Sequence, residues 1–358
     1  MGICMSTESS PRIGLALTGG GAKGAYHVGA LKALAELDVP VHAVSGASIG
    51  ALNGAIVATS PDLDQAHHNL FNIWRELGSD KVIALSNKAP AFLAMLVGMG
   101  TAFRAIPMLS TGVTLATKIA DVFDLDVPRL NGQVLDETHL VRLLEACTQP
   151  ELFRNGLPFY VSVYESGGGV DDLLGVLLSV VRLSNTRESD FLHIQSLSDA
   201  DMQEALLASA ALPVLFRARQ VGNAYYTDGG QGDWYGVGGN TPVKPLVDAG
   251  CDIVIVVHLC DGSIWDRSQY KNVNVIEIRP RTSIARGHAV ADILGFDHQR
   301  IDSWMTQGYD DSINILKRVF DTIRTVNRME SSRSRLQGSL DQGSESDRLL
   351  ADAMKRIR

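Results

Sequence analysis

The sequence predicts an α/β fold in which a mostly parallel central sheet is flanked by helices. The first observation is that apolar runs of strand length, at 13–17 and 41–44, each precede a helical pattern, at 25–37 and 49–58. The second is the run 253–259, which is apolar almost without interruption, as expected of a strand buried on both faces. The third is composition: 45% of the 358 residues are hydrophobic, which is enough for a large core. Strands that alternate with helices favour a parallel sheet.

The remaining elements follow from the same periodicities. Further strands are predicted at 159–164, 191–195, 224–227 and 273–278, and further helices at 61–77, 136–147, 198–212 and 297–323. We expect one α/β domain over 12–328, preceded by a flexible N-terminus at 1–11 and followed by a disordered or weakly helical tail at 329–358. An apolar helical insertion is expected at about 82–130. Its uncharged apolar run is too short to span a bilayer. It is expected to be a buried helix or a lid that meets a membrane surface.

Charge and cysteine content exclude several classes of function. The net charge of −8 argues against nonspecific binding of nucleic acid. The four cysteines show no metal-ligand spacing, no zinc or calcium motif is present, and no cofactor is predicted. The N-terminus has no signal-peptide pattern, so a cytoplasmic protein is expected. Gly2 and Cys4 lie in a match to the N-myristoylation pattern, for which a chance match is the favoured interpretation.

The segment Gly46-Ala47-Ser48-Ile49-Gly50 has the G-x-S-x-G pattern of a nucleophile elbow. It stands between a predicted strand and a predicted helix, where the two glycines allow a tight turn that exposes the serine hydroxyl. A chance match in a chain with 34 glycines is the alternative. The elbow makes Ser48 the candidate nucleophile.

A glycine-rich loop, 18–24, follows the first predicted strand and supports the catalytic interpretation. Successive glycines at a strand-to-helix junction can turn several amides toward one point, as an oxyanion or a phosphate requires. A dinucleotide site is disfavoured because 39–43 contains no acidic residue, and a P-loop because Gly24 follows Lys23. The loop is therefore predicted to hold an oxyanion beside Ser48.

A third candidate, Asp228, begins the segment Asp228-Gly229-Gly230 after the strand 224–227. An Asp-Gly pair alone most often marks an ordinary turn. A conventional Ser-Asp-His triad is also open from the sequence, because His258, His288 and His298 all follow Asp228.

The glycine loop, the serine elbow, Asp-Gly-Gly and Asn240-Thr241-Pro242, in that order, resemble the patatin-like phospholipase family, as does the segment 210–216. The resemblance implies a three-layer α/β/α fold and a Ser–Asp dyad, with Ser48 as the nucleophile and Asp228 as its base. It implies an oxyanion hole at Gly19, Gly20, Gly21 and Ala22, and supporting roles for Lys23, Gly24, Gly46, Gly50, Gly229 and Gly230.

The function that the resemblance implies is hydrolysis of fatty acyl esters of membrane phospholipids, with transient contact with a membrane surface. The alternatives are a soluble carboxylesterase or thioesterase with the same dyad, an effector lipase that needs an activator, and a silent lipid-binding regulator. Some bacterial family members are secreted effectors, so secretion stays open. Against the silent regulator, Ser48, Asp228 and the glycine loop are all intact.

Overall fold

The computed structural model describes residues 11–79, 149–167, 186–211, 218–233, 237–262, 265–285 and 298–357. The chain forms two compact units, Met1–Ser312 and Ile313–Arg358. The predicted flexible N-terminus with Gly2 and Cys4, the apolar insertion at about 82–130, the helix at 136–147 and most of the segment 210–216 lie outside the described residues.

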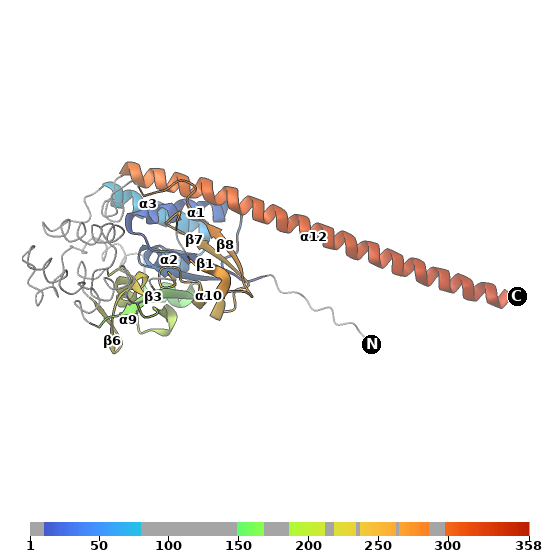
Figure 1. Ribbon diagram of the computed structural model, residues 1–358, viewed down its shortest axis with the longest axis horizontal. Helices are drawn as coiled ribbons and strands as arrows, with labels where there is room; N and C mark the ends of the chain where they lie inside the picture. Colours follow the sequence, from blue (N-terminus) through green and yellow to red (C-terminus); the bar gives the residue numbers. More distant parts are fainter. Residues whose placement is uncertain are drawn as a thin grey trace, which may run out of the picture. The chain divides into compact units, whose positions relative to one another are not determined.

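The first unit is built on a mixed sheet whose strand order, in the described residues, is β5-β6-β3-β2-β1-β7-β8, with β4 paired to β3 (Figure 1). The five strands β3, β2, β1, β7 and β8 run parallel, and β4, β5 and β6 add antiparallel pairs. The bounds are β1 Ile13–Leu17, β2 Ala43–Ala47, β3 Phe159–Glu165, β4 Asp190–His193, β5 Arg219–Val221, β6 Ala224–Asp228, β7 Ile253–Val257 and β8 Asn274–Ile278. The predicted fold class is confirmed; β5 is a strand that the sequence did not reveal.

The helices also occupy most of the positions that periodicity predicted. Their bounds are α1 Ala25–Glu36, α2 Ile49–Thr59, α3 Leu63–Ser79, α7 Pro150–Asn155, α9 Asp199–Ser209, α10 Lys244–Asp248 and α12 His298–Ile357. Two short 3₁₀ turns matter for the site, η1 Gly21–Gly24 and η4 Gly229–Gln231. Among the described residues, no helix is long and apolar enough to cross a bilayer.

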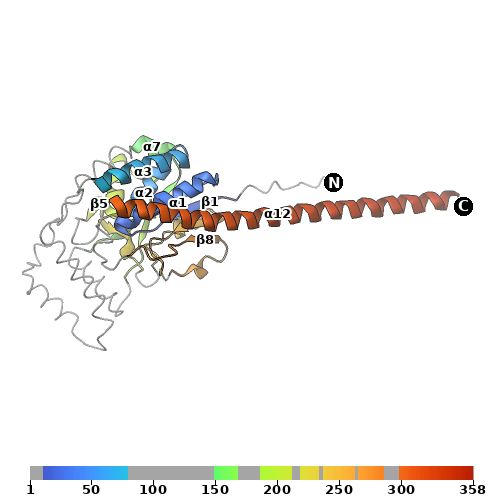
Figure 2. The same ribbon diagram turned by 90° about the horizontal axis from the view of Figure 1, so that it is seen from above.

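Alternating side chains of the parallel strands are buried on both faces of the sheet. On one face Ala16, Val254 and Val256 pack with Leu246 of α10 and with Trp265. The opposite alternation, which includes Leu15, Leu17 and Ile255, is equally buried. Helices α1 and α3 lie side by side (Figures 1 and 2). This double burial explains why β7 reads as a continuous apolar run.

The first part of α12 packs closely on α1 because glycines permit the backbones to approach. A Cβ on Gly29 would lie 1.9 Å from the carbonyl oxygen of Met305, and one on Gly308 would lie 2.1 Å from that of Tyr26. The Tyr26 hydroxyl hydrogen-bonds Asp311 Oδ2 at 3.1 Å. These contacts belong to the first unit and fix the start of α12 on the sheet domain.

The tail differs from the sequence prediction. The structure continues α12 to Ile357 through the stretch for which we expected disorder or weak helix. The stretch contains no proline, so nothing in it interrupts the helical hydrogen bonds. The unit boundary falls between Ser312 and Ile313; the predicted domain limit at residue 328 stays a prediction.

Candidate active site

Ser48 lies at the turn between β2 and α2, in a backbone conformation that residues other than glycine rarely adopt. Its φ is 53° and its ψ is −125°, and it is the N-cap residue of α2. Positive φ is uncommon for a residue with a Cβ and marks a strained turn when it occurs. This strand–turn–helix geometry is that of a nucleophile elbow.

Two glycines make the elbow sterically feasible. A Cβ on Gly46 would lie 2.3 Å from the carbonyl oxygen of Gly50, and one on Gly50 would lie 2.1 Å from that of Leu17. Gly50 thus lets the first turn of α2 rest on the end of β1. The supporting roles predicted for Gly46 and Gly50 stay predictions.

Gly50→Ala should therefore destabilise the protein by about 3 kcal/mol or more, because the new methyl group meets rigid backbone atoms. Gly338→Ala is the matched control: it lies in α12 with open space around it, so the same methyl group should be neutral or slightly stabilising. Thermal unfolding of the two variants measures the difference. Equal melting temperatures would contradict the close approach of α2 to β1.

The sheet register brings Asp228 near Ser48 although 180 positions separate them in the sequence. Ala47, which precedes Ser48, pairs with Ser162 of β3. The next residue of β3, Val163, pairs with Asp228 at the end of β6. One strand therefore lies between the serine and the aspartate, and the two residues lie at neighbouring levels along β3, although β2 runs parallel and β6 antiparallel to it.

The Asp228 carboxyl is buried and only partly hydrogen-bonded. Its side chain belongs to a residue that is 3% exposed. Oδ1 accepts the Gly230 amide at 2.7 Å, while Oδ2 has no hydrogen-bond partner among the described residues. Burial raises the pKa of Asp228 from 3.8 to about 6, although the Ser48 hydroxyl and the Gly230 amide act in the opposite direction. A carboxylate with a raised pKa is a better base than an ordinary aspartate.

The Ser48 hydroxyl is close enough to the Asp228 carboxyl to lower its pKa. Among the described residues, Oδ2 of Asp228 has no partner with standard hydrogen-bond geometry. In active sites without substrate, catalytic hydrogen bonds are commonly long or poorly aligned and shorten only on binding.

Ser209, the last residue of α9, holds the backbone of the elbow. Its Oγ accepts the Ser48 amide at 2.9 Å and donates to the carbonyl oxygen of Ser162 at 2.6 Å. Ser209 is fully buried. Sequence analysis missed this residue; the available signal was a serine at the end of an otherwise apolar helical stretch.

The glycine loop lies against Ser48, but one of its amides is already bound. A Cβ on Gly19 would lie 3.0 Å from Ser48 Cβ, which places the loop beside the serine. The Gly19 amide donates to Asn240 Oδ1 at 3.1 Å. Gly21, with φ 60°, has the conformation that only glycine adopts easily. Of the predicted oxyanion donors, Gly19 is thus engaged within the protein.

The other predicted loop residues line the same junction. Ala22 is buried, and Lys23 is partly buried at the end of η1. A Cβ on Gly24 would lie 2.6 Å from Ile49 Cγ1, so Gly24 fits the loop against the elbow helix. Gly229 fits against Ser162, where a Cβ would lie 2.4 Å from the carbonyl oxygen, and a Cβ on Gly230 would lie 3.1 Å from Asn240 Oδ1. Asn240 therefore lies between the glycine loop and the Asp228 turn, a position its motif did not reveal.

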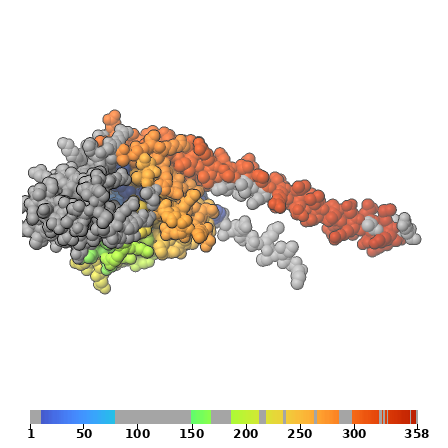
Figure 3. All heavy atoms as spheres, viewed as in Figure 1, coloured from blue at the N-terminus to red at the C-terminus, as the bar shows by residue number. Residues whose placement is uncertain are grey.

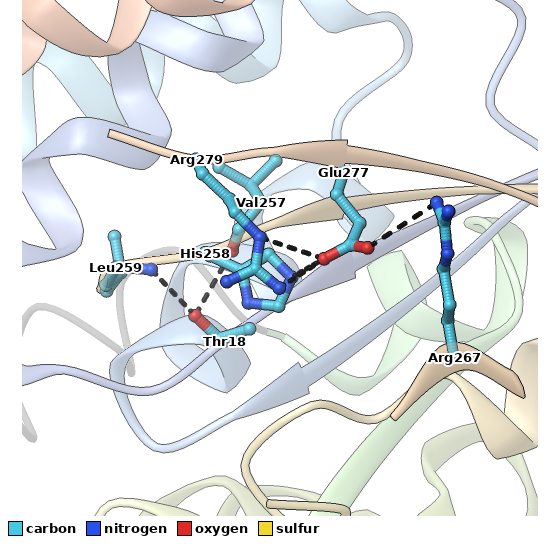
Figure 4. Close-up of polar contacts among 7 residues, drawn as sticks. All are labelled: Thr18, Val257, His258, Leu259, Arg267, Glu277 and Arg279. Atoms are coloured by element: carbon cyan, nitrogen blue, oxygen red, sulfur yellow. Dashed lines mark hydrogen bonds and ion pairs between the residues drawn. The ribbon is translucent and has the colours of Figure 1, made fainter. Parts of the chain in front are cut away.

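Thr18 ties the start of the glycine loop to the end of β7 (Figure 4). Its hydroxyl lies 3.2 Å from the Val257 carbonyl oxygen, to which it donates, and accepts the Leu259 amide at 3.1 Å. Because both bonds are buried, they fix the point at which the loop leaves the sheet.

The histidines do not join Ser48 and Asp228 in the described part of the chain. His258 is buried, and its Nε2 contacts Glu277 Oε2 at 3.1 Å on the neighbouring strand β8, where Arg279 also binds Glu277 (Figure 4). Burial lowers the pKa of His258. His298 is paired with Asp302 within α12, at 3.1 Å, and His288 lies outside the described residues. The pairing of His258 fits a structural role.

No group of three or more His, Cys, Asp or Glu side chains suitable for a metal ion occurs in the parts of the chain that the structure describes. The fold and the site define an α/β protein with a serine elbow, a glycine-rich loop beside it and a buried carboxyl one strand away. Comparison with known families gives the same class: the patatin-like phospholipase family matches residues 15–247. The chain belongs to the patatin-like phospholipase family.

Individual relatives share shorter segments. The chain is 42% identical over 76 residues to a putative patatin-like phospholipase domain-containing protein of Caenorhabditis elegans, a match that covers 18% of this chain and 7% of the relative. It is 61% identical over 44 residues to neuropathy target esterase of Drosophila melanogaster, which covers 12% and 3%. Each match thus spans less than a tenth of the relative's length.

Two solved structures are similar over most of the chain. VipD of Legionella pneumophila has a TM-score of 0.41 and 16% identity, covering 86% of this chain and 67% of that one. ExoU, in its complex with SpcU from Pseudomonas aeruginosa, has a TM-score of 0.39 and 16% identity, covering 86% and 52%.

Proposed function

We propose that this protein is a serine acyl hydrolase that cleaves fatty acyl esters of phospholipids through a Ser48–Asp228 dyad. The observation that carries the proposal is the backbone of Ser48, strained to φ 53° at the turn into α2, next to a buried carboxyl whose Oδ2 has no partner among the residues that the structure describes. A strained turn and an unpartnered buried oxygen both cost stability, and such costs concentrate at functional sites.

The chemistry begins with transfer of the Ser48 hydroxyl proton to Asp228 Oδ2 as Ser48 Oγ attacks the ester carbonyl carbon. The tetrahedral intermediate collapses, the ester C–O bond breaks, and the departing alcohol oxygen takes the proton from Asp228. Water then attacks the acyl-enzyme with Asp228 again as base, which releases the fatty acid and restores Ser48. The raised pKa of Asp228 suits it to take up and return this proton near neutral pH.

The negative charge of the intermediate would be stabilised by the glycine loop. The amides of Gly20, Gly21 and Ala22 are the proposed donors, each contributing about 3 kcal/mol to lowering the barrier. Gly19 can contribute only if its bond to Asn240 opens, because an amide with a partner at 3.1 Å is not available to a second acceptor. Asn240 is better assigned to hold the loop in place.

The substrate class rests on the family and on Lys23. The name of the matching family supports phospholipids, and a cation in this first helical turn is favourable only when it faces an anion such as a lipid phosphate. Transient contact with a membrane surface follows from a lipid substrate. The alternative is a soluble carboxylesterase or thioesterase that uses the same dyad.

The test is release of fatty acid by the purified full chain from vesicles of mixed phospholipids, compared with a short soluble acyl ester. We expect faster turnover on vesicles, and a transient acyl adduct on the Ser48 peptide in quenched samples analysed by mass spectrometry. Turnover of the soluble ester alone would favour the esterase alternative or an enzyme that awaits an activator. An acyl adduct on any other residue would overturn the dyad.

A further inference from the structure

Exposed apolar side chains are concentrated on α12. Of the eight large hydrophobic residues that are exposed in the described part of the chain, six lie on this helix: Met329, Leu336, Leu340, Leu349, Leu350 and Met354. Between 331 and 350 every residue is exposed (Figure 3). Propensity alone gives a long helical segment little stability, and most helical stability comes from packing of an apolar face.

Many of the apolar residues between 319 and 357 follow a heptad repeat. One set of core positions contains Met329, Leu336, Gly343, Leu350 and Ile357, spaced by seven. The other contains Val319, Val326, Arg333, Leu340, Asp347 and Met354. Alternating steps of three and four connect these positions over 319–357, as in a coiled-coil seam. Thr322, Arg333, Gly343 and Asp347 interrupt the apolar pattern, and Phe320, Ile323 and Leu349 lie outside the seam.

We propose that residues 319–357 of α12 form an antiparallel coiled coil with the same segment of a second copy of this chain. The seam contains two charged residues, and these decide the orientation. In a parallel pair Arg333 would face Arg333, and Asp347 would face Asp347, which places two like-charge contacts in the core. An antiparallel pair separates the like charges.

In one antiparallel register, every position of one core set lies opposite a position of the other core set on the second copy. This register places Leu336 against Leu340 of the second copy, and Met329 against Asp347. Arg333 then lies opposite Gly343, which has no side chain and has open space around it. Asp347 of the second copy is one helical turn from that glycine, about 6 Å along the axis, within reach of the Arg333 guanidinium.

This register explains why a glycine, Gly343, stands inside the helix. Glycine in a helix interior costs about 1 kcal/mol relative to alanine. Opposite Arg333, the missing side chain leaves room for a long side chain to cross the seam. Since the interface has twofold symmetry, each dimer contains two such Arg333–Asp347 pairs.

The positions that flank the seam favour pairing with an identical helix. Identical helices repel when like charges line these positions. Here they hold small or uncharged residues with a single charge, Glu330, in the segment 325–353: Thr325, Glu330, Ser332, Gln337, Ser339, Ser344, Ser346, Ala351 and Ala353. A helix that lies on a membrane needs a broader apolar face than this narrow seam.

The experiment is light scattering coupled to size exclusion on the full chain, with the dimer dissociation constant taken from sedimentation equilibrium. Arg333→Glu and Asp347→Lys each replace two attractive pairs by two repulsive ones, so each should weaken the dimer about tenfold. The double variant restores opposite charges and should return to within about twofold of the parent. These exposed positions leave the sheet domain unchanged, which circular dichroism and acyl-ester turnover verify.

Orientation has its own test. A mixture of Leu336→Cys and Leu340→Cys chains should form the cross-linked heterodimer faster than either variant alone, measured above the background of the native cysteines. Preferential self-cross-linking of Leu340→Cys would show a parallel pair and overturn the antiparallel register. A monomeric parent at about 50 μM, or a dimer indifferent to both charge reversals, would overturn the proposal. So would a monomer that binds anionic vesicles until Leu340→Glu is introduced, since the occupant would then be lipid.

Discussion

Ser48→Ala is expected to lower kcat for acyl-ester hydrolysis by at least about 10³-fold. The substitution removes the proposed attacking oxygen, and the glycine loop alone can provide only residual stabilisation of the transition state. KM should change little, because the acyl chain does not depend on the hydroxyl for binding. Fatty acid release from vesicles under saturating lipid measures the effect.

Ser45→Ala is the matched control for that experiment. Ser45 lies on β2, three residues before Ser48, and is fully buried. Its Oγ donates to the Pro242 carbonyl oxygen at 2.5 Å and does not reach the elbow. The control should lose about 1 kcal/mol of stability and keep its turnover. If Ser48→Ala and Ser45→Ala retained similar activity, the nucleophile would have to be sought elsewhere.

Asp228→Asn should lower kcat by about 10³- to 10⁴-fold, because an amide cannot take the serine proton. In the parent, kcat/KM should fall as the pH drops through about 6, where the Asp228 carboxylate becomes protonated. This pH dependence distinguishes a base from a residue that only shapes the turn. A rate profile that is flat between pH 5 and 8 in the parent, by contrast, would assign the proton transfer to another group.

The same variant should be more stable than the parent at pH 7. A pKa raised from 3.8 to about 6 means that the ionised Asp228 costs the folded state about 3 kcal/mol at neutral pH. Asn removes this cost and keeps an oxygen for the Gly230 amide, so we expect a gain of about 1–3 kcal/mol. Stability from a neutral Asp228 is fully present below pH 4 and is lost as the pH rises through 6. The advantage of the variant should therefore vanish at low pH.

Urea unfolding of parent and variant at pH 7.5 and pH 4 tests this sign. A variant that is inactive yet more stable at pH 7.5 identifies a group retained for activity at the expense of stability. A variant that is less stable at both values would indicate that Asp228 serves the fold through the Gly230 turn instead.

The sequence predicted the fold through local signals that survive folding unchanged. β1 and β7 were visible because buried parallel strands consist of apolar residues, and α1, α2 and α3 because their periodicity is that of a helix. β5 was missed because three residues carry too little pattern. The tail differed because its Ser-, Arg- and Gly-rich composition indicates disorder, whereas the structure shows a helix. The apolar residues of this helix recur only every three or four positions, so the polar residues between them dominate the composition.

The features of the candidate site also fall into those that the sequence predicted and those that depend on tertiary structure. The sequence by itself determined that Ser48 follows a strand between two glycines, that a glycine loop precedes it, and that Asp228 ends a strand, because each is a short motif whose geometry is local. Only the tertiary structure decided that β3 lies between the strands of Ser48 and Asp228. It also decided that the Ser48 amide donates to Ser209 and that the Gly19 amide donates to Asn240. Those relations join residues up to 221 positions apart, and contacts at that separation depend on how the strands pack rather than on neighbouring residues.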